Sequence, residues 1–131
     1  SQLYRFGDII DSGARVSFGS DFYGPISGDY NYFFAPLLNI EMGMTRKFPG
    51  EKTVPDTPPG DALLTLEEMI RGYTLDAAYQ LNMENEIGSV EPGKLADLIV
   101  IEHNLFDLDT YEIHKTQVNM TMMNGKVVYQ Q

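Results

Sequence analysis

The sequence predicts an α+β fold, with helices concentrated before residue 85 and strands after it. Before residue 85, apolar residues recur at helical spacing, most clearly over Thr65–Leu81. After residue 85, apolar residues alternate with polar ones or form short β-branched runs, as in Leu98–Ile101. The Asn124-Gly125 pair is a strong short-range signal for a β-hairpin. On these patterns alone, the two parts could pack as one α+β domain or belong to two domains of a larger protein.

The composition fits a folded protein and excludes several classes of partner. The chain has 131 residues, 43% hydrophobic and 21% charged, which is enough for one domain with a core. Nine Lys and Arg stand against nineteen Asp and Glu, and a net charge of -10 repels phosphate backbones, so we expect no nucleic-acid partner. No apolar run approaches the roughly 20 residues that span a bilayer, and no basic amphipathic segment favours a membrane surface. The absence of cysteine excludes disulfides and thiolate chemistry and fits a cytosolic protein.

A short apolar strand leads to the candidate site residue, Asp21. Leu3–Ile10 is typical of the end of a helix, and Gly13 is typical of its stop. Ala14–Phe18 follows as a buried strand, and Gly19 permits a sharp exit that places Asp21 at the strand's carboxyl end. In α/β folds, loops at that end converge on an open face where sites are built. Gly, Ser and Asp also favour ordinary turns, so on the local pattern alone a turn aspartate is the simpler interpretation.

Two further helices are expected before residue 85. Pro36–Arg46 has apolar residues near helical spacing and a proline suited to the first turn, and Phe48–Asp61 is expected to be an exposed loop. Thr65 and Glu68 form a capping box at the start of a helix that runs to about Leu81. Three acidic residues of that helix are interpreted as solvated and without a catalytic role: Glu67, Glu68 and Asp76.

The second part of the chain is expected to be mainly β. Gly93 follows Pro92 in a run typical of a type II turn, because proline fixes φ at one position and glycine supplies positive φ at the next. Asp109 is expected to cap a short helix that ends near His114. The expected strands are Glu86–Val90, Leu98–Ile101, Val118–Met123 and the residues around Val127–Tyr129.

Several runs of residues, taken in order, resemble the amidohydrolase superfamily. The run from Glu86 to Val100 resembles a signature near the C-terminus of these enzymes, as does the closing hairpin Val118–Tyr129. Ser17–Asp21 resembles their last barrel strand. Three other runs resemble the metal-dependent group called amidohydrolase-3 or YtcJ-like: Met44–Lys47, Leu64–Glu68 and Tyr73–Ala78. The resemblance covers nearly the whole chain.

The resemblance implies a split architecture. The family has a TIM-like (β/α)8 barrel that carries the site, and a small β-sandwich assembled from both chain ends. Residues 1–84 would hold the last barrel helix and strand and the helices that follow, and residues 85–131 the C-terminal part of the sandwich. We therefore expect a C-terminal fragment of a larger enzyme.

The resemblance also implies hydrolysis of amide-like, non-peptide C–N bonds in a small molecule by a metal-activated water. The metal is expected to be zinc in the parent enzyme, and Asp21 matches the aspartate that binds it and accepts the proton of the water. The other ligands, histidines and often a modified lysine, belong to earlier strands of the family. His103 and His114 are interpreted as surface or capping residues, and Ser17 and Ser20 have no partner base. A lone carboxylate holds a catalytic metal poorly, so we expect no bound metal and no activity from the chain alone.

Other interpretations stay open at this stage. Arg46 could anchor a loop, bind a substrate anion in the parent enzyme, or simply be solvated. The alternative to an enzyme fragment is a non-catalytic, acidic α+β domain that binds or assembles with a partner. If the barrel is truncated, its apolar face is exposed, and we expect the chain to self-associate through that face.

Overall fold

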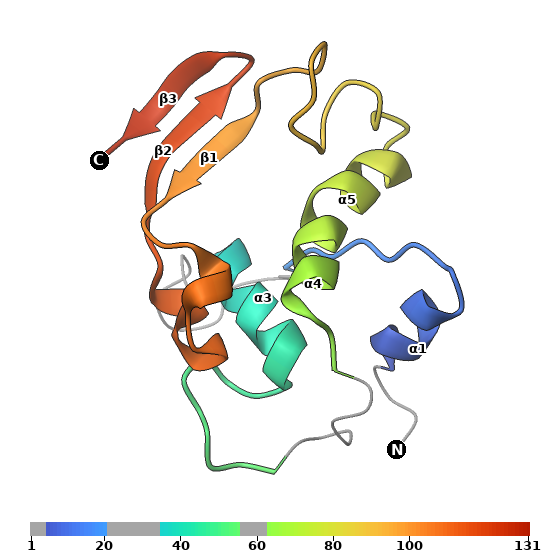
Figure 1. Ribbon diagram of the computed structural model, residues 1–131, viewed down its shortest axis with the longest axis vertical. Coiled ribbons are helices and arrows are strands. Elements are labelled where there is room, and N and C mark those ends of the chain that lie inside the picture. The colour runs from blue at the N-terminus through green and yellow to red at the C-terminus, as the bar shows by residue number, and fades with distance from the viewer. Residues whose placement is uncertain (1–4, 21–34, 56–62) are drawn as a thin grey trace, which may run out of the picture.

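The computed structural model describes residues 5–20, 35–55 and 63–131. Within these residues, helices lie beside a three-stranded sheet, and two short 3-10 helices continue from the sheet toward the helical side (Figure 1). The elements in chain order are α1 (Phe6–Asp11), α3 (Pro36–Thr45), α4 (Leu66–Tyr73), α5 (Leu75–Gln80), β1 (Leu98–Ile101), η2 (Leu105–Asp107), η3 (Thr110–Lys115), β2 (Val118–Met123) and β3 (Lys126–Gln130). This arrangement confirms the predicted α+β class and the change from helices to strands along the chain.

The expected helices in the first part of the chain form close to their predicted bounds. α1 ends before Gly13, whose φ of +87° suits a glycine stop. α3 begins with Pro36 in its first turn and ends at Thr45, and the capping residue Arg46 adopts the left-handed conformation with a φ of 56°. The hydrogen bond from the Arg46 N–H to the Met42 carbonyl, at 2.8 Å, closes the last turn.

The predicted helix from Thr65 to about Leu81 is two helices. The capping box forms as expected: the Glu68 N–H donates to Thr65 Oγ1 at 3.2 Å, and the Thr65 N–H donates to Glu68 Oε2 at 2.7 Å. Thr74 then interrupts the helix with φ -123° and ψ -89°, and its hydroxyl donates to the Ile70 carbonyl at 2.8 Å. A threonine hydroxyl that competes for a helical carbonyl favours such a break, and helical periodicity does not reveal it.

The expected strand Ala14–Phe18 does not form. Residues 14–20 run without regular structure, and Val16 and Phe18 are only partly buried. A strand requires a neighbour to complete its hydrogen-bond ladder, and no strand among the described residues lies beside this segment. The Ala14 N–H donates to the Ile9 carbonyl of α1 at 3.3 Å, and the Phe18 N–H donates to the Gly72 carbonyl at 3.2 Å.

The sheet has the order β1-β2-β3, with both pairs antiparallel. Asn124 and Gly125 join β2 to β3 with φ values of 47° and 73°, which confirms the predicted hairpin turn. The prediction of a strand over Glu86–Val90 is wrong, because this segment is a series of turns in which Gly88 has a φ of +91°. A Cβ on Gly88 would lie 2.6 Å from the Cβ of Ala78, so the backbone here packs directly on α5.

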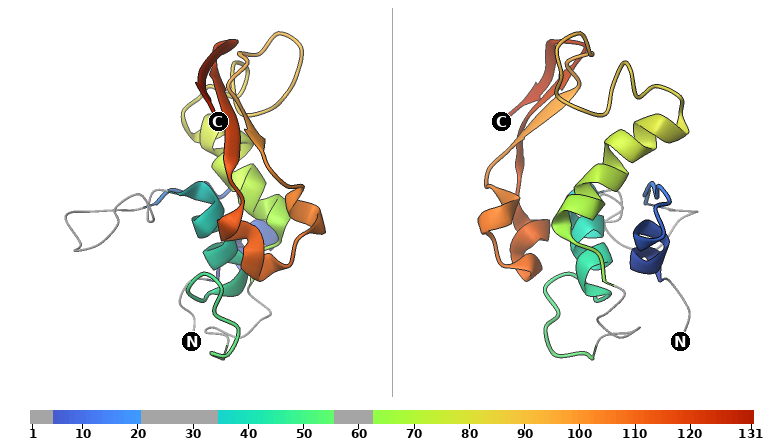
Figure 2. Two further views of the ribbon diagram at one scale, coloured as in Figure 1. Left: turned by 90° about the vertical axis from the view of Figure 1, so that its left-hand side faces the viewer. Right: turned by 45° about the vertical axis from the view of Figure 1, so that its right-hand side comes forward.

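The core joins the helices to the 3-10 segments. Its buried members come from both parts of the sequence: Ile40, Leu64, Leu66, Met69, Leu105 and Ile113. In the right-hand view of Figure 2, the sheet with η2 and η3 lies on one side, α4 and α5 lie in the middle, and α1 lies on the far side. The helix expected from Asp109 is the 3-10 helix η3, and the Asp109 carboxylate accepts from the Tyr111 N–H at 2.9 Å as a cap. No described helix has the length and apolar character needed to cross a membrane.

Candidate functional site

The candidate residue Asp21 lies outside the described residues, but the segment that leads to it is described up to Ser20. α4 and α5 hold this segment. The Phe18 N–H donates to the Gly72 carbonyl, and the Ser17 hydroxyl donates to the side-chain carbonyl of Gln80. Both contacts come from packed helices, so Ser17 and Phe18 are held against α4 and α5.

Gly72 permits the close approach of this segment to α4. A Cβ at position 72 would lie 2.3 Å from Phe18 Cδ2 and 3.0 Å from the Val16 carbonyl oxygen. The Phe18 ring packs edge-on against Phe6, with centroids 5.9 Å apart, and lies 6.1 Å from the Tyr73 ring. The side chain of Phe18 therefore anchors the approach to Asp21 against α1 and α4.

A cavity of about 360 Å³, which we call the Phe18 pocket, lies beside Gly19, two residues before Asp21. Its walls are mostly apolar, and its polar groups come from Asn39, Arg46 and Tyr73. The Arg46 guanidinium lies 5.6 Å from the Phe6 ring centre, and burial lowers the pKa of Arg46. Burial raises the pKa of Tyr73, and a side-chain hydrogen bond with Asn39 partly opposes that shift. Arg46 is therefore partly buried rather than simply solvated.

Glu41 forms a buried polar centre that the sequence analysis left without a role. Its side chain is 0% exposed, and Oε1 accepts from the Gly50 N–H at 2.7 Å. Oε2 accepts from the backbone N–H of His114 at 2.9 Å and lies 2.7 Å from His114 Nδ1. One carboxylate thus joins α3, the loop after it and η3. Glu41 shares a face of α3 with Leu38 and Thr45, which the structure also buries.

The two histidines differ in how far their side chains are exposed. His103 is exposed and lies 3.6 Å from the carboxylate of Glu102, so its interpretation as a surface residue is confirmed. The interpretation of His114 as a surface or capping residue is wrong, because its side chain is only 18% exposed and pairs with Glu41. Within residues 5–20, 35–55 and 63–131, no group of three or more His, Cys, Asp or Glu side chains is placed to hold a metal ion. The described residues therefore do not by themselves fit a catalytic metal.

The prediction that Asp76 is solvated is also wrong. Asp76 is buried, its Oδ2 accepts from Arg71 Nε at 3.0 Å, and its Oδ1 lies 3.7 Å from Arg15 Nη1. The Arg15 guanidinium also lies 4.0 Å above the ring of Tyr79. Asp76 thus ties the segment that precedes Val16 to α4 and α5. Glu67 is exposed as predicted.

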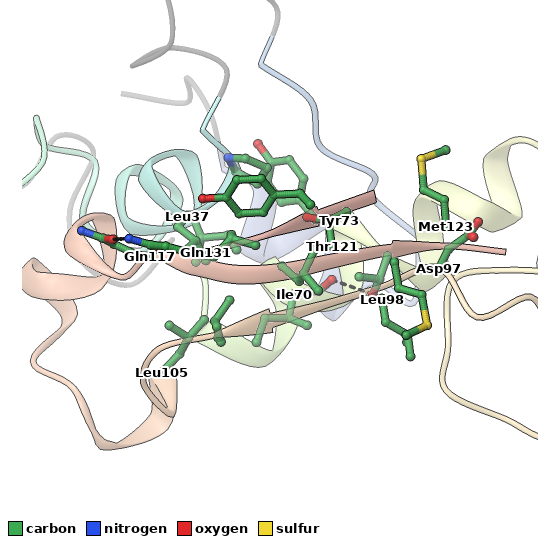
Figure 3. Close-up of a pocket in the computed structure, with 18 residues that line it drawn as sticks. Leu37, Ile70, Tyr73, Asp97, Leu98, Leu105, Gln117, Thr121, Met123 and Gln131 are labelled. Carbon is green, nitrogen blue, oxygen red and sulfur yellow. Dashed lines mark hydrogen bonds between the residues drawn. The ribbon is translucent and has the colours of Figure 1, made fainter. Parts of the chain in front are cut away.

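A larger cavity, which we call the sheet cleft, lies between one face of the sheet and helices α3 and α4 (Figure 3). It encloses about 1120 Å³, and its walls include Leu37, Ile70 and Leu98. Asp97 is the charged residue of its lining, and the Asp97 carboxylate accepts from the Asn124 N–H at 2.6 Å. This bond gives Asp97 a structural role at the turn between β2 and β3. The cleft can accept apolar groups, but its described lining offers no acid–base pair for hydrolysis.

Comparison with known proteins identifies the chain's relatives. The profile of the amidohydrolase family matches residues 1–129. The chain is 32% identical to the 5-methylthioadenosine/S-adenosylhomocysteine deaminase of Symbiobacterium thermophilum over 127 residues, which cover 90% of this chain and 27% of the deaminase. It is 29% identical to the putative amidohydrolase YtcJ of Bacillus subtilis, covering 97% of this chain and 22% of YtcJ.

A solved amidohydrolase structure from Thermotoga maritima has the same fold over most of this chain. The TM-score is 0.62 at 22% identity, and the match covers 95% of this chain and 25% of the Thermotoga protein. The chain thus spans about a quarter of the length of the relatives it matches. The family match over residues 1–129 confirms the resemblance that the ordered sequence runs indicate. The chain belongs to the amidohydrolase family.

Proposed function

We propose that this chain forms the C-terminal part of a hydrolase that cleaves C–N bonds in small, amide-like, non-peptide substrates. The observation that carries the proposal is the anchored approach to Asp21: the segment from Val16 to Ser20 lies against Gly72 in a chain of the amidohydrolase family. The deaminase of Symbiobacterium thermophilum is a relative whose name describes hydrolysis at a C–N bond. Asp21 is the residue that we assign to the reacting site.

The proposed architecture is the end of a TIM-like barrel followed by part of a β-sandwich. In this interpretation, α1 and the segment 14–20 are the last barrel helix and strand, and the sheet β1-β2-β3 belongs to the sandwich. The likeness to a solved amidohydrolase structure, with a TM-score of 0.62 over 95% of this chain, supports this view. The apolar walls of the sheet cleft support it as well, since a sandwich sheet is covered by a second layer. The boundary near residue 85 remains part of the proposal.

Amidohydrolases are generally metal-dependent, and the metal is an essential part of the proposal. The described residues do not complete a metal site, so Asp21 would contribute one carboxylate to a site whose other ligands come from elsewhere. Zinc is the metal that we propose, by analogy with the family. Activation of a water by that metal remains the reaction implied by the resemblance. It follows that the chain alone should not turn over substrate.

A second candidate function is a non-catalytic binding or assembly domain. The sheet cleft favours it, because about 1120 Å³ of mostly apolar space could accept an apolar segment of a partner.

The absence of cysteine fits a reducing compartment for either function, and we propose the cytosol.

A chimaeric enzyme separates the two functions. The C-terminal part of the Symbiobacterium thermophilum deaminase that matches this chain would be replaced by residues 1–131, and deamination would be followed by ultraviolet absorbance. We expect the chimaera to deaminate and the isolated chain, with added zinc, to remain inactive toward the same substrate and toward simple N-acyl compounds. A folded chimaera without activity would contradict the enzyme proposal. Turnover by the isolated chain that Asp21→Ala abolishes would contradict its predicted inactivity.

A further inference from the structure

The turn between β2 and β3 joins an asparagine to a glycine, and this pair of residues can react without a catalyst. Asn124 is the only asparagine in the sequence that a glycine follows. Both residues are exposed, and a Cβ built on Gly125 would meet no atom within 4 Å. Because glycine has no side chain to shield its nitrogen, that nitrogen can reach the side-chain amide of the preceding asparagine. The turn is therefore a candidate site of spontaneous deamidation.

Deamidation at this turn needs only the chain and water. The Gly125 nitrogen loses its proton and attacks Cγ of Asn124, so that an N–C bond forms, the Cγ–Nδ2 bond breaks and ammonia leaves. The product is a cyclic succinimide, which water opens at either of its carbonyls. Addition of water at Cγ gives aspartate. Addition at the backbone carbonyl carbon of residue 124 gives isoaspartate, in which the chain runs through the former side chain.

Two hydrogen bonds hold the turn away from the geometry that ring closure requires. The Asn124 N–H donates to Asp97 Oδ1 at 2.6 Å, and the Gly125 N–H donates to the Ala96 carbonyl at 3.1 Å. To reach Cγ, the Gly125 nitrogen must turn toward the Asn124 side chain, and this rotation of the peptide group takes the Gly125 N–H away from Ala96. The reaction thus requires a local opening of the turn, and its rate follows the population of the open form.

We propose that Asn124 is a deamidation site of this chain and that Asp97 sets the rate by holding the turn closed. Asp97 is suited to this role because its carboxylate accepts from the backbone of Asn124 in a charge-assisted hydrogen bond. Every group that takes part lies within residues 96–125. The inference therefore uses no edge or apolar face of the sheet, and it does not depend on the proposed hydrolase function.

The reaction would place another carboxylate at a turn that Asp97 already contacts. Aspartate at position 124 adds a negative charge close to Asp97, and the repulsion of like charges destabilises the turn. Isoaspartate also lengthens the backbone by a carbon atom, which disturbs the pairing of Met123 opposite Lys126. We expect either product to weaken the β2–β3 hairpin, so the aged chain should unfold at a lower temperature than the fresh chain.

Peptide mass spectrometry during incubation of the folded chain at alkaline pH tests the site. We expect the peptide that contains Asn124 to gain the mass difference between an amide and a carboxyl group, to include isoaspartate, and to convert faster than peptides with the other asparagines. Asp97→Ala removes the acceptor of the Asn124 N–H and should speed this conversion at least about tenfold, because hydrogen bonds to charged groups are strong. Asp97→Asn keeps an acceptor oxygen and should convert at an intermediate rate.

Further measurements keep the test valid if a variant misfolds. Asn124→Gly suits the φ of 47° and removes the reacting amide, so incubation should leave its thermal stability unchanged. The wild type in guanidinium chloride should convert faster than the folded wild type, since unfolding releases the turn.

Two sets of results would overturn the proposal. Conversion of Asn124 in the wild type that is absent, or no faster than that of the other asparagines, would contradict the site. The control by the turn would be contradicted if Asp97→Ala, shown by circular dichroism to be folded, converted at the wild-type rate. Equal rates for the folded and the unfolded wild type would contradict it as well.

Discussion

Glu41 and His114 are 73 positions apart in the sequence, and their side chains meet with 2.7 Å between Oε2 and Nδ1. The same oxygen accepts the backbone N–H of His114, and the other oxygen accepts the N–H of Gly50. A carboxylate is costly to bury unless hydrogen bonds replace its hydration, and here two backbone N–H groups and the His114 ring surround it. The pair thus fixes η3 and the loop after α3 onto one helix.

Replacing Glu41 should destabilise the chain strongly. Glu41→Ala leaves the Gly50 and His114 donors without an acceptor inside the protein, and we expect the free energy of unfolding to fall by about 3 kcal/mol. Urea denaturation measures this change. Glu67→Ala, at an exposed position of α4, is the matched control and should cost less than about 1 kcal/mol.

A double-mutant cycle shows whether the loss comes from the pair. Glu41→Ala, His114→Ala and the double variant should give a coupling energy of at least about 1 kcal/mol, since the two side chains are in direct contact. Additive effects would contradict the assignment of the pair as a joint anchor.

Gly72→Ala should disturb the segment that leads to Asp21. The added methyl group would lie 2.3 Å from Phe18 Cδ2 and 3.0 Å from the Val16 carbonyl oxygen, and overpacking of this kind costs roughly 1–3 kcal/mol. The gain in helix propensity from alanine, about 1 kcal/mol, offsets only part of that loss. Thermal unfolding followed by circular dichroism checks the result.

The control for this change is Gly19→Ala in the same segment. A Cβ on Gly19 would meet no atom within 4 Å, so the variant should unfold within about 0.5 kcal/mol of the wild type. Equal effects of the two substitutions would mean that the close contact between Gly72 and Phe18 is not formed.

The local features of the fold were predictable from the sequence. The capping box at Thr65 and the hairpin turn at Asn124-Gly125 depend on residues close together in the chain, and both form. The cap at Asp109 belongs to the same group. Such elements are selected by turn and capping chemistry that short windows of sequence contain.

The features that were missed depend on distant residues. The burial of Asp76 requires Arg71 and Arg15, and the burial of Glu41 requires η3, neither of which helical periodicity can reveal. The strand expected at Ala14–Phe18 fails because strand formation requires a neighbour. The sequence predicts Asp21 as the candidate site residue, and Asp21 lies outside the described residues. The structure shows that the preceding residues Val16 and Phe18 pack closely on Gly72.

The pKa of Tyr73 leads to a prediction on alkaline pH. Burial favours the neutral phenol, so the pKa of Tyr73 in the folded chain lies above its ordinary value of about 10. A raised folded-state pKa contributes stability below the ordinary value, and this contribution is lost as the pH rises through the folded value. The free energy of unfolding should therefore fall less steeply above about pH 10 in Tyr73→Phe than in the wild type.

Absorbance titration of the phenolate provides the direct reading. The difference between the wild type and Tyr73→Phe isolates Tyr73 and should show ionisation above the ordinary value. The exposed Tyr129→Phe variant controls for removal of a phenol in general. Ionisation of Tyr73 at or below the ordinary value would show that the ring is not packed beside Phe18 as described.

The assignment of Asp21 is tested most directly by the turnover number of the deaminase chimaera carrying Asp21→Asn. Asparagine keeps the size of the side chain and removes its charge, so we expect kcat to fall at least about 100-fold, as for loss of a catalytic acid–base group. Asp11→Asn, at the exposed end of α1, should leave kcat unchanged. A folded Asp21→Asn chimaera with the kcat of its parent would contradict the central claim that Asp21 takes part in hydrolysis.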